Sequence, residues 1–260
     1  MKPIADFDPI VAKNLVGVLF DLDDTLLDHG QITEQAYGAL WRLHEAGLKL
    51  LAVTGRPSGW ADVITRLWPV DGMVTENGIV TLLKRGHNLF ERLDEVDELT
   101  RADRRERLLA LAQDIRNRFD FIVPASDVHL RRADYTFDIG ETRQVDKLLV
   151  DQVEDYARLK GARTVRSSVH LHICFDGSDK GSGAVRAIAA AFGLDSTLAR
   201  ARFAFIGDSE NDEPAFSTFQ NCVGVRNLRG RPTVPPRYRT QGERGAGFAE
   251  FAQWVIRLRG

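Results

Sequence analysis

The chain has 260 residues, of which 43% are apolar and 28% charged, and its formal net charge is −2. This length suits one large domain or two small ones, and either arrangement can bury a core. The near-zero net charge argues against a nucleic-acid partner, because binding to the phosphate backbone requires concentrated positive charge. No apolar run is long enough to span a bilayer, which argues against a membrane protein.

The N-terminal segment and the cysteines bear on cellular location. The first fifteen residues contain acids and lack a continuous apolar run, so they do not resemble a signal peptide. Two cysteines occur, Cys174 and Cys222, and both lie in apolar runs that predict buried thiols rather than a disulfide or a metal site. These features predict a cytoplasmic protein.

The first part of the chain alternates between strand and helix patterns. Residues 15–23 form a short, nearly continuous apolar run, as expected for a parallel strand that is covered on both faces. Thr33 and Gly47 suit the two ends of the helix that follows, and a second strand ends at Thr54. A helix and a further strand then reach Gly78. This alternation predicts right-handed crossovers and a parallel sheet.

The pattern changes near Leu83. A strongly charged helix is predicted at residues 100–119 and another at residues 144–160. Alternating polar and apolar residues around these helices predict strands with one polar face, as in an antiparallel sheet that is exposed on one side. From Asp179 the strand and helix alternation returns and ends in an amphipathic helix.

The predicted fold class is therefore α/β, with a doubly wound parallel sheet and an inserted α+β module, which we call the cap. The expected boundaries are residues 1–82 and 172–260 for the core and residues 83–171 for the cap. The sequence gives no indication of the oligomeric state.

Four short segments carry the polar side chains that are best placed for chemistry. They are FDLDDTLLD with Asp21 and Asp23, VTGR with Thr54 and Gly55, DGSDKGSG with Lys180, and IGDSEND with Asp208, Asn211 and Asp212. Three of these segments follow predicted parallel strands, and Lys180 begins a predicted helix. Ligands of open α/β sheets bind beyond the carboxyl ends of the strands. We therefore expect these side chains to converge on one crevice.

Converging carboxylates repel one another and call for a cation. Mg²⁺ prefers oxygen ligands, and it binds through one or two carboxylates together with water and substrate phosphate. An Asp-rich site without nearby His or Cys fits this ion. A phosphoryl group would fit between the metal and Lys180, and aspartate is a known nucleophile toward phosphoryl groups. The sequence thus predicts an enzyme that uses Mg²⁺ and acts on a small phosphorylated metabolite.

In this order, the four motifs resemble those of the haloacid dehalogenase superfamily of phosphohydrolases. The resemblance spans residue 16 to the closing helix. The insertion after the second motif, with the sequence TENG just before it, is similar to the large cap of the Cof-type (type IIB) subgroup, which includes sugar-phosphate phosphatases. The resemblance implies hydrolysis of a phosphomonoester, with a sugar phosphate as the expected substrate class.

The resemblance also implies a role for each motif residue. Asp21 would attack phosphorus, and Asp23 would first protonate the leaving oxygen and then activate the hydrolytic water. The other implied roles are phosphate binding by Thr54, Gly55, Lys180 and Asn211, and magnesium binding by Asp21, the backbone carbonyl of Asp23, Asp208 and Asp212. One departure is Asp24, which stands where many relatives have glycine.

The sequence leaves the cap side chains and Arg56 open. Arg131 and Arg132 are expected on opposite faces of a strand, where at most one faces the cleft and both could instead form a solvated edge. His170 and His172 share the polar face of a strand, where they could contact a sugar or lie exposed. A metal site at this His pair is disfavoured, because no carboxylate or Cys partner is evident. Arg56 could guide an anionic substrate or pair with a nearby acid.

Two other functions remain open at this point. A phosphomutase of the same superfamily would return the phosphoryl group to a sugar instead of to water. A non-catalytic binding module could descend from a decayed enzyme, although the complete set of motif residues argues against decay.

Overall fold

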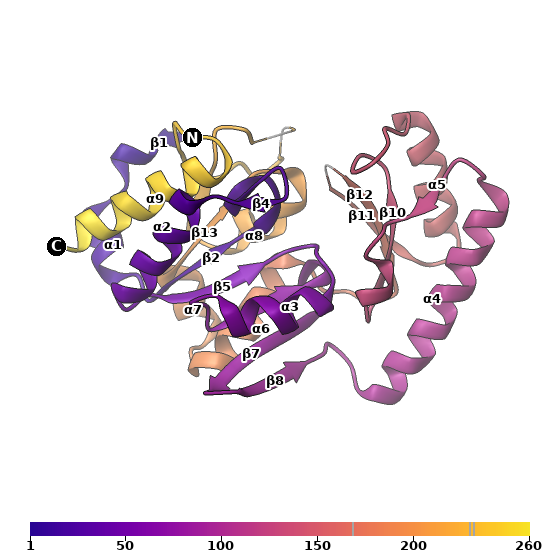
Figure 1. The fold of residues 1–260 in the computed structure, drawn as a ribbon, viewed down its shortest axis with the longest axis horizontal. Helices are drawn as coiled ribbons and strands as arrows, with labels where there is room; N and C mark the ends of the chain where they lie inside the picture. The colour runs from indigo at the N-terminus through magenta and orange to yellow at the C-terminus, as the bar shows by residue number, and fades with distance from the viewer. Residues whose placement is uncertain (168, 229, 231) are drawn as a thin grey trace.

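The computed structural model describes residues 1–167, 169–228, 230 and 232–260. The chain forms two bodies that lie side by side (Figure 1). The larger body contains the two ends of the chain, and the smaller one is built from its middle. Within the described residues, no helix combines the length and the apolar character that crossing a bilayer requires.

A nine-stranded sheet forms the centre of the larger body, which we call the core. The strands, in spatial order, are β1 (Lys2–Pro3), β15 (Tyr238–Arg239), β14 (Asn221–Gly224), β13 (Phe203–Gly207), β2 (Gly17–Phe20), β5 (Lys49–Val53), β6 (Gly72–Thr75), β7 (Val80–Gly86) and β8 (Leu89–Leu93). Neighbouring strands from β1 to β6 are parallel, whereas β7 and β8 are antiparallel. The predicted parallel α/β sheet is confirmed.

Helices cover both faces of this sheet, as a doubly wound fold requires. Alternate strand residues point to opposite faces, so Val18 and Phe20 join one apolar cluster and Leu19 joins the other. The first cluster includes side chains of α2 (Glu34–Glu45), α3 (Ser58–Leu67) and α9 (Arg244–Arg259), with α1 (Pro9–Asn14) beside them. The second includes side chains of α6 (Lys180–Phe192), α7 (Ser196–Arg202) and α8 (Glu213–Thr218).

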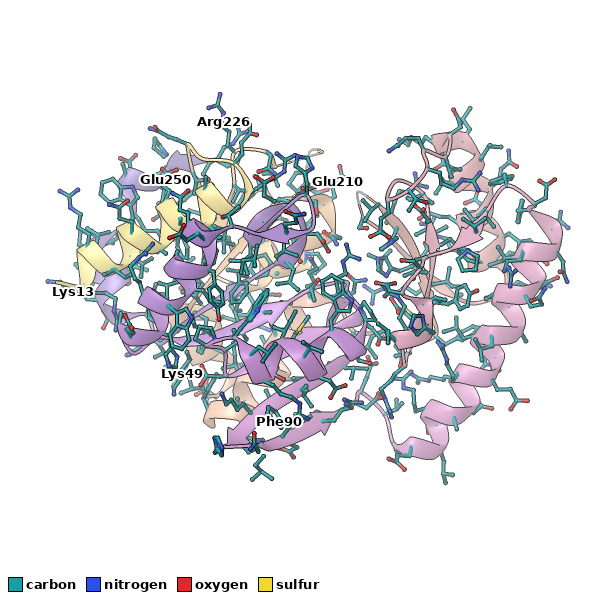
Figure 2. The ribbon with its side chains drawn as sticks, in the orientation of Figure 1. Lys13, Lys49, Phe90, Glu210, Arg226 and Glu250 are labelled. Atoms are coloured by element: carbon teal, nitrogen blue, oxygen red, sulfur yellow. The ribbon has the colours of Figure 1, made fainter. Side chains whose placement is uncertain are left out.

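The carboxyl ends of the central strands face the smaller body. Lys49 marks the amino end of β5, whereas Glu210 lies beyond the carboxyl end of β13, on the side toward the smaller body (Figure 2). A short hairpin of β3 (Leu27–Asp28) and β4 (Gln31–Ile32) lies between β2 and α2 in the sequence. Because the carboxyl ends of the strands face the smaller body, which is the cap, a site at these strand ends lies under the cap.

Among its described residues, the cap contains a four-stranded antiparallel sheet and two α-helices. The strands, in spatial order, are β11 (Arg163–Arg166), β12 (His170–Cys174), β10 (Asp134–Asp138) and β9 (Val123–Pro124). Helices α4 (Glu98–Arg118) and α5 (Lys147–Leu159) bury the apolar face of this sheet. The opposite face lies toward the core, so the sheet stands between its helices and the core (Figure 1).

The expected boundaries of the cap differ from the observed sheets at both ends. Strands β7 and β8 continue the large sheet to Leu93, so residues 83–93 pair with the core. Strand β12 pairs with β10 through Cys174, so residues 172–174 belong to the cap sheet. The alternating pattern of an antiparallel extension resembles that of the cap strands, and sequence alone does not separate them. Cys174 and Cys222 are buried free thiols, as predicted.

Two short segments link the bodies, at residues 94–97 and 175–179, and ion pairs hold them together. Arg101 Nη2 lies 2.6 Å from Asp94 Oδ1 on the first link, and its Nη1 lies 2.8 Å from Asp176 Oδ2 on the second. Glu95 also accepts a hydrogen bond from the backbone N–H of Gly177 (3.1 Å). These contacts hold the two linking segments to each other.

The glycines that begin α6 let this helix pack closely against its neighbours. Asp179 caps the helix by accepting from the Ser182 backbone N–H, and Lys180 is the first helical residue. A Cβ atom at Gly183 would lie 2.4 Å from the backbone oxygen of Gly78. The close approach of Gly183 to Gly78 therefore fixes the start of α6, and with it the backbone of Lys180.

We predict that Gly183→Ala destabilises the protein by about 3 kcal/mol, because the methyl group would meet backbone atoms that cannot move aside. The matched control is Gly38→Ala in α2, where a Cβ would meet only the flexible end of Arg42 at 3.2 Å. That control should raise stability by about 0.5–1 kcal/mol. Urea unfolding of the two variants measures both effects, and equal stabilities would contradict the packing argument.

Candidate active site

The order of the strands brings the predicted motif residues together. Asp21, Thr54 and Asp208 directly follow β2, β5 and β13, which are neighbours in the order β13, β2, β5. Lys180 begins α6, whose side chains pack on the same sheet. Parallel strands end at one edge of a sheet, so the predicted convergence follows directly from this topology.

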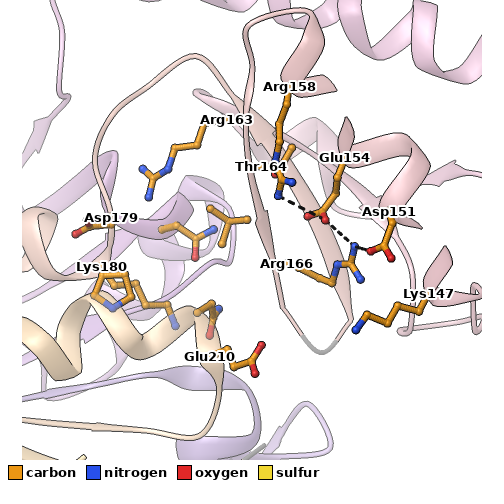
Figure 3. Close-up of a pocket in the computed structure, with 14 residues that line it drawn as sticks. Lys147, Asp151, Glu154, Arg158, Arg163, Thr164, Arg166, Asp179, Lys180 and Glu210 are labelled. Carbon is orange, nitrogen blue, oxygen red and sulfur yellow. Dashed lines mark hydrogen bonds and ion pairs between the residues drawn. The ribbon is translucent and has the colours of Figure 1, made fainter. Parts of the chain in front are cut away.

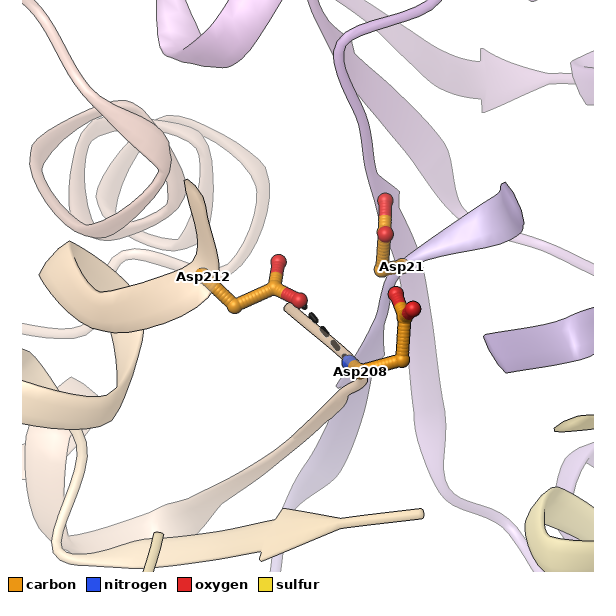
Figure 4. Close-up of side chains that lie close together, drawn as sticks. All are labelled: Asp21, Asp208 and Asp212. Atoms are coloured by element: carbon orange, nitrogen blue, oxygen red, sulfur yellow. Dashed lines mark hydrogen bonds between the residues drawn. The ribbon is translucent and has the colours of Figure 1, made fainter. Parts of the chain in front are cut away.

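Three buried aspartates form the centre of the site. Asp21, Asp208 and Asp212 each offer a carboxylate oxygen, and these oxygens lie within 4.8 Å of one another (Figure 4). Asp212 Oδ2 accepts hydrogen bonds from the backbone N–H groups of Asp208 (2.9 Å) and Ser209 (3.1 Å). Asp212 is therefore held by its own loop, whereas Asp21 and Asp208 face each other across the neighbouring strand ends.

Lys180 is the cation closest to these acids. Its side chain is buried, and Nζ lies 2.9 Å from Asp21 Oδ1 and 2.6 Å from Asp212 Oδ1. Burial alone would lower the pKa of Lys180, but the two carboxylates outweigh burial and raise it. The lysine is thus charged and fixed between two of the acids, on one side of the group.

The acids carry more negative charge than Lys180 neutralises. Burial raises the pKa of Asp21 to about 7, with Lys180 opposing the rise and Asp212 and Asp23 adding to it. Burial and the neighbouring Asp212 and Asp21 also raise the pKa of Asp208. Asp208 Oδ1 is 3.3 Å from the Thr25 hydroxyl, but among the described residues its buried Oδ2 has no hydrogen-bond partner. An oxygen-rich site with an unpartnered carboxylate oxygen fits a hard divalent cation.

Asp23 pairs with Arg56, which settles the open question about this arginine in favour of an acid partner. Arg56 Nε donates to Asp23 Oδ2 at 2.8 Å, and its Nη2 donates to Oδ1 at 2.9 Å. The remaining Nη1 lies 3.1 Å from Glu141 Oε1 and 3.4 Å from Asp127 Oδ2, both in the cap. The guanidinium also lies 4.6 Å from the centre of the Trp60 ring. Arg56 therefore links the second motif aspartate to the cap.

Thr54, Gly55 and Asn211 lie at the same edge of the sheet. The Thr54 hydroxyl accepts from the Arg56 backbone N–H at 3.1 Å, and Asn211 Oδ1 accepts from the Ser209 hydroxyl at 2.5 Å. A Cβ at Gly55 would lie 3.2 Å from Asn77 Oδ1 and from the His172 ring, so glycine permits this close approach. With Asp21, Asp23 and Asp208, these residues line a cavity of about 20 Å³ under the cap.

The structure corrects the expectation for Arg131 and Arg132. Both precede β10, after the short 3₁₀ helix Val128–Leu130, so they do not occupy opposite faces of a strand. Arg131 is buried, and its Nη1 donates to the backbone oxygen of Gly55 at 3.0 Å and to Asp134 Oδ1 at 2.9 Å. Arg132 is exposed. The solvated-edge alternative is wrong for Arg131, which connects the cap to the loop after β5.

His170 and His172 are buried and line the cavity, so the alternative of exposed histidines is wrong. The expectation that they lack acidic neighbours is also wrong. His172 Nδ1 lies 2.7 Å from Asp134 Oδ2, and His170 Nε2 lies 3.0 Å from Glu141 Oε2. Asp134 and Glu141 come from β10 and the loop after it, so no local sequence pattern pairs them with these histidines.

Glu76, in the TENG sequence, is a structural residue that sequence reasoning missed. It is fully buried, and Oε1 accepts from the Ser58 backbone N–H (3.0 Å) in the core. Oε1 also accepts from Arg132 N–H (3.0 Å), and Oε2 accepts from the N–H groups of Ala133 (2.7 Å) and Asp134 (2.9 Å) in the cap. One carboxylate thus joins both bodies. The TENG sequence was the available signal, but it indicated only a family likeness.

Asp24 stands where many relatives have glycine, and the backbone conformation at this position favours glycine. Its φ is 55°, in the left-handed region, which non-glycine residues adopt at some cost. Its carboxylate Oδ1 lies 3.0 Å from Arg244 Nε at the start of α9. The extra acid next to the motif is therefore compensated by its own arginine.

A larger cleft adjoins the acids between the core and the cap. It has a volume of about 450 Å³ and is lined by residues of both bodies (Figure 3). Lys180 and Asn211 form part of its core wall, and Arg163 and Arg166 form part of its cap wall. Clefts of this size accommodate small metabolites.

We predict that Asp208→Asn stabilises the metal-free protein by about 1–2 kcal/mol at pH 8, since it removes an uncompensated buried charge. The raised pKa of Asp208 means that wild-type stability falls as pH rises above the ordinary carboxyl value of 3.8, so the gain should be smaller at pH 5. The control, Asp212→Asn, should destabilise by about 3 kcal/mol because it leaves Lys180 poorly paired. Unfolding in EDTA tests both signs.

Comparison with known proteins agrees with this geometry. A sequence model of the family of haloacid dehalogenase-like hydrolases matches residues 18–102. No curated protein matches the chain by sequence. Among solved structures, a Thermoplasma acidophilum protein matches with a TM-score of 0.75 and 18% identity, covering 93% of this chain and 99% of that one.

Two further solved structures share the fold. The sucrose-phosphatase of Synechocystis, solved with sucrose and phosphate, has a TM-score of 0.65 and 18% identity, covering 92% of this chain and 98% of that one. A HAD/COF-like hydrolase candidate from Plasmodium vivax has a TM-score of 0.69 and 15% identity, covering 96% of this chain and 100% of that one. Residues 18–102 thus match the family of haloacid dehalogenase-like hydrolases, and the chain shares its fold with these solved structures.

Proposed function

We propose that the protein is a magnesium-dependent phosphatase that hydrolyses a small phosphomonoester through a phospho-aspartate on Asp21. The observation that supports this best is the position of Lys180 Nζ, 2.9 Å from Asp21 Oδ1, beside the group formed by Asp21, Asp208 and Asp212. A candidate nucleophile, a fixed cation and a candidate metal site thus share one edge of the sheet. A small phosphorylated metabolite as the ligand and the cytoplasm as the location stay predictions.

The carboxylates of Asp21 and Asp208 and the backbone carbonyl of Asp23 are the groups that would hold magnesium. Asp212 already binds Lys180 and two backbone N–H groups, so it would orient the site from behind. When bound, magnesium would neutralise charge on the phosphoryl oxygens and on the acids. The unpartnered Asp208 Oδ2 supports a cation at this point.

Asp21 would attack phosphorus, forming an oxygen–phosphorus bond while the bond from phosphorus to the leaving oxygen breaks. Asp23, once protonated, would give its proton to that oxygen and later take one back from the water that attacks the phospho-aspartate. This second step returns Asp21 and releases inorganic phosphate. Lys180 and the loop at Thr54 and Gly55 would hold the phosphoryl oxygens. Arg56 fixes the direction of the Asp23 carboxylate through two hydrogen bonds.

The cap would have to move during this reaction. The cavity that contains Asp21 and Asp23 measures about 20 Å³, which is room for about one water molecule. A phosphomonoester therefore needs the cap to open before it can reach Asp21, and closure would then exclude bulk water.

A sugar or polyol phosphate is the substrate class that we favour. The adjoining cleft of about 450 Å³ has space for such a leaving group. The sucrose-phosphatase of Synechocystis, which shares the fold, was solved with sucrose and phosphate. The protein described as related to trehalose-6-phosphate phosphatase has a TM-score of 0.59 and 15% identity, covering 94% of this chain and 97% of that one.

We predict that Asp21→Asn reduces phosphate release from p-nitrophenyl phosphate by at least about 1,000-fold, because an amide is a poor nucleophile. Asp24→Asn is the matched control, since Asp24 pairs with Arg244, and it should keep activity within about threefold. Release of free phosphate from a sugar phosphate distinguishes hydrolysis from a mutase reaction. Wild-type turnover by Asp21→Asn would refute the role of Asp21.

We predict that magnesium binding releases at least about one proton at pH 6 and weakens as pH falls below 7. Burial raises the pKa of Asp21 to about 7 and also raises that of Asp208, and a carboxyl group must lose its proton to bind a metal. The apparent Kd should therefore rise at least about tenfold per pH unit below 7. Isothermal titration in two buffers with different ionisation enthalpies counts the released protons. Asp21→Asn is the control, and a pH-independent Kd would contradict the prediction.

A further inference from the structure

The cap contributes a histidine–carboxylate pair that faces the catalytic edge. His172 on β12 and Asp134 on β10 belong to adjacent strands of the cap sheet, and Nδ1 of the histidine lies 2.7 Å from Oδ2 of the aspartate. Both side chains are buried. Because both belong to one sheet, this pair would move with the cap as a unit.

Asp134 determines which nitrogen of His172 carries the proton. Arg131 Nη1 donates to both Asp134 oxygens, at 2.9 and 3.0 Å. Burial raises the pKa of Asp134, and this ion pair opposes the rise. Because Arg131 donates to both of its oxygens, Asp134 acts as an acceptor toward the ring. The ring must then donate from Nδ1, which leaves a lone pair on Nε2.

His172 remains neutral near pH 7. Burial lowers its pKa well below the ordinary value, and the positive charge of Arg131 lowers it further. A neutral ring with its proton on Nδ1 can only accept a hydrogen bond at Nε2. The partner that completes this site must therefore be a donor.

The Nε2 side of the ring faces the loop after β5. A Cβ atom at Gly55 would lie 3.3 Å from Nε2 and 3.2 Å from Cε1, so the ring lies directly against this glycine. His172 also lines the cavity that contains Asp21 and Asp23. The acceptor nitrogen is thus beside the position proposed for the phosphoryl group.

An acceptor at this position does not suit the phosphoryl oxygens, which are themselves negatively charged acceptors. It suits a hydroxyl group of the leaving alcohol. The nearby cations Arg56, Arg131 and Lys180 are each bound to carboxylates, so they do not favour a second anionic group on the substrate. The wall around His172 therefore matches a neutral, hydroxylated leaving group.

On the basis of the proposed phosphatase activity, we infer that His172 is a specificity-determining residue that accepts a hydrogen bond from a hydroxyl group close to the phosphoester, and that Asp134 positions it. The substrate class is then a phosphorylated polyol or sugar with a free hydroxyl near the ester.

Two phosphate esters that differ in one hydroxyl group test this role. Wild-type protein should prefer 2-hydroxypropyl phosphate to n-propyl phosphate about tenfold in kcat/KM, the ratio expected for one hydrogen bond. His172→Asn keeps an amide near Nδ1 but removes the acceptor at Nε2, so this preference should fall to about twofold or less, through loss on the hydroxylated ester alone. Activity on n-propyl phosphate and p-nitrophenyl phosphate should stay within about threefold.

Two further variants serve as a control and as a partial rescue for this test. His129→Asn makes the same change at an exposed histidine of the cap and should leave the preference unchanged. His172→Gln places an amide oxygen near the position of Nε2 and should recover part of the preference. Thermal unfolding of all variants shows whether the cap remains folded.

A spectroscopic measurement on the unmodified protein tests the tautomer without relying on any variant. The ¹⁵N shifts of His172, assigned by comparison with His172→Gln, should show a protonated Nδ1 and an unprotonated Nε2 from pH 5.5 to pH 8, because burial keeps the ring neutral. A proton on Nε2 in this range would overturn the inference.

The kinetic outcomes separate this inference from the proposed function. Wild-type protein that hydrolyses p-nitrophenyl phosphate but shows no preference between the two propyl esters contradicts the role of His172 and leaves the phosphatase proposal intact. Equal losses on all three esters in His172→Asn would mean a structural role and would also overturn the inference. Absence of hydrolysis of every ester by the wild-type protein with magnesium would refute the proposed function itself.

Discussion

The site depends on the burial of several carboxylates at one edge of a parallel sheet. The order β13, β2, β5 places Asp208 beside Asp21, and the loop after β13 returns Asp212 to the same point. Burying like charges in a medium of low polarity is unfavourable unless cations compensate them. Lys180 compensates part of this charge from the start of α6. The glycines of α6 allow the close packing that places Lys180, and Lys180 in turn compensates the charge of the acids.

The other acids near this edge have cations of their own. Arg56 binds Asp23 through two hydrogen bonds, and Arg244 pairs with Asp24. Because these pairs account for the outer acids, the excess negative charge is concentrated at Asp21 and Asp208. Within the described part of the chain, the unpartnered oxygen at this point is Asp208 Oδ2. The fold thus confines the need for an additional cation to one small volume.

The sequence predicted that the motif residues converge, because the signals for this convergence are local. Each motif residue directly follows an apolar strand or begins a helix, and strand ends in a parallel sheet meet at one edge. The cap contacts have no such signal. Glu76 binds Asp134 across 58 residues of sequence, and Arg56 binds Glu141 across 85 residues. These pairs depend on how the cap docks on the core. The antiparallel extension to Leu93 was predicted to belong to the cap because the strand and helix alternation of the core changes near Leu83.

The contacts of Arg56 suggest how the site can keep its geometry while the cap moves. Its two hydrogen bonds to Asp23 lie within the core, whereas its contacts with Glu141 and Asp127 cross to the cap. A cap that opens must break the second set and can leave the first intact. Asp23 would then stay oriented, while the face that carries His172 moves away with the cap sheet. The core would thus retain the phosphoryl chemistry throughout, and the cap would contribute selectivity when it closes.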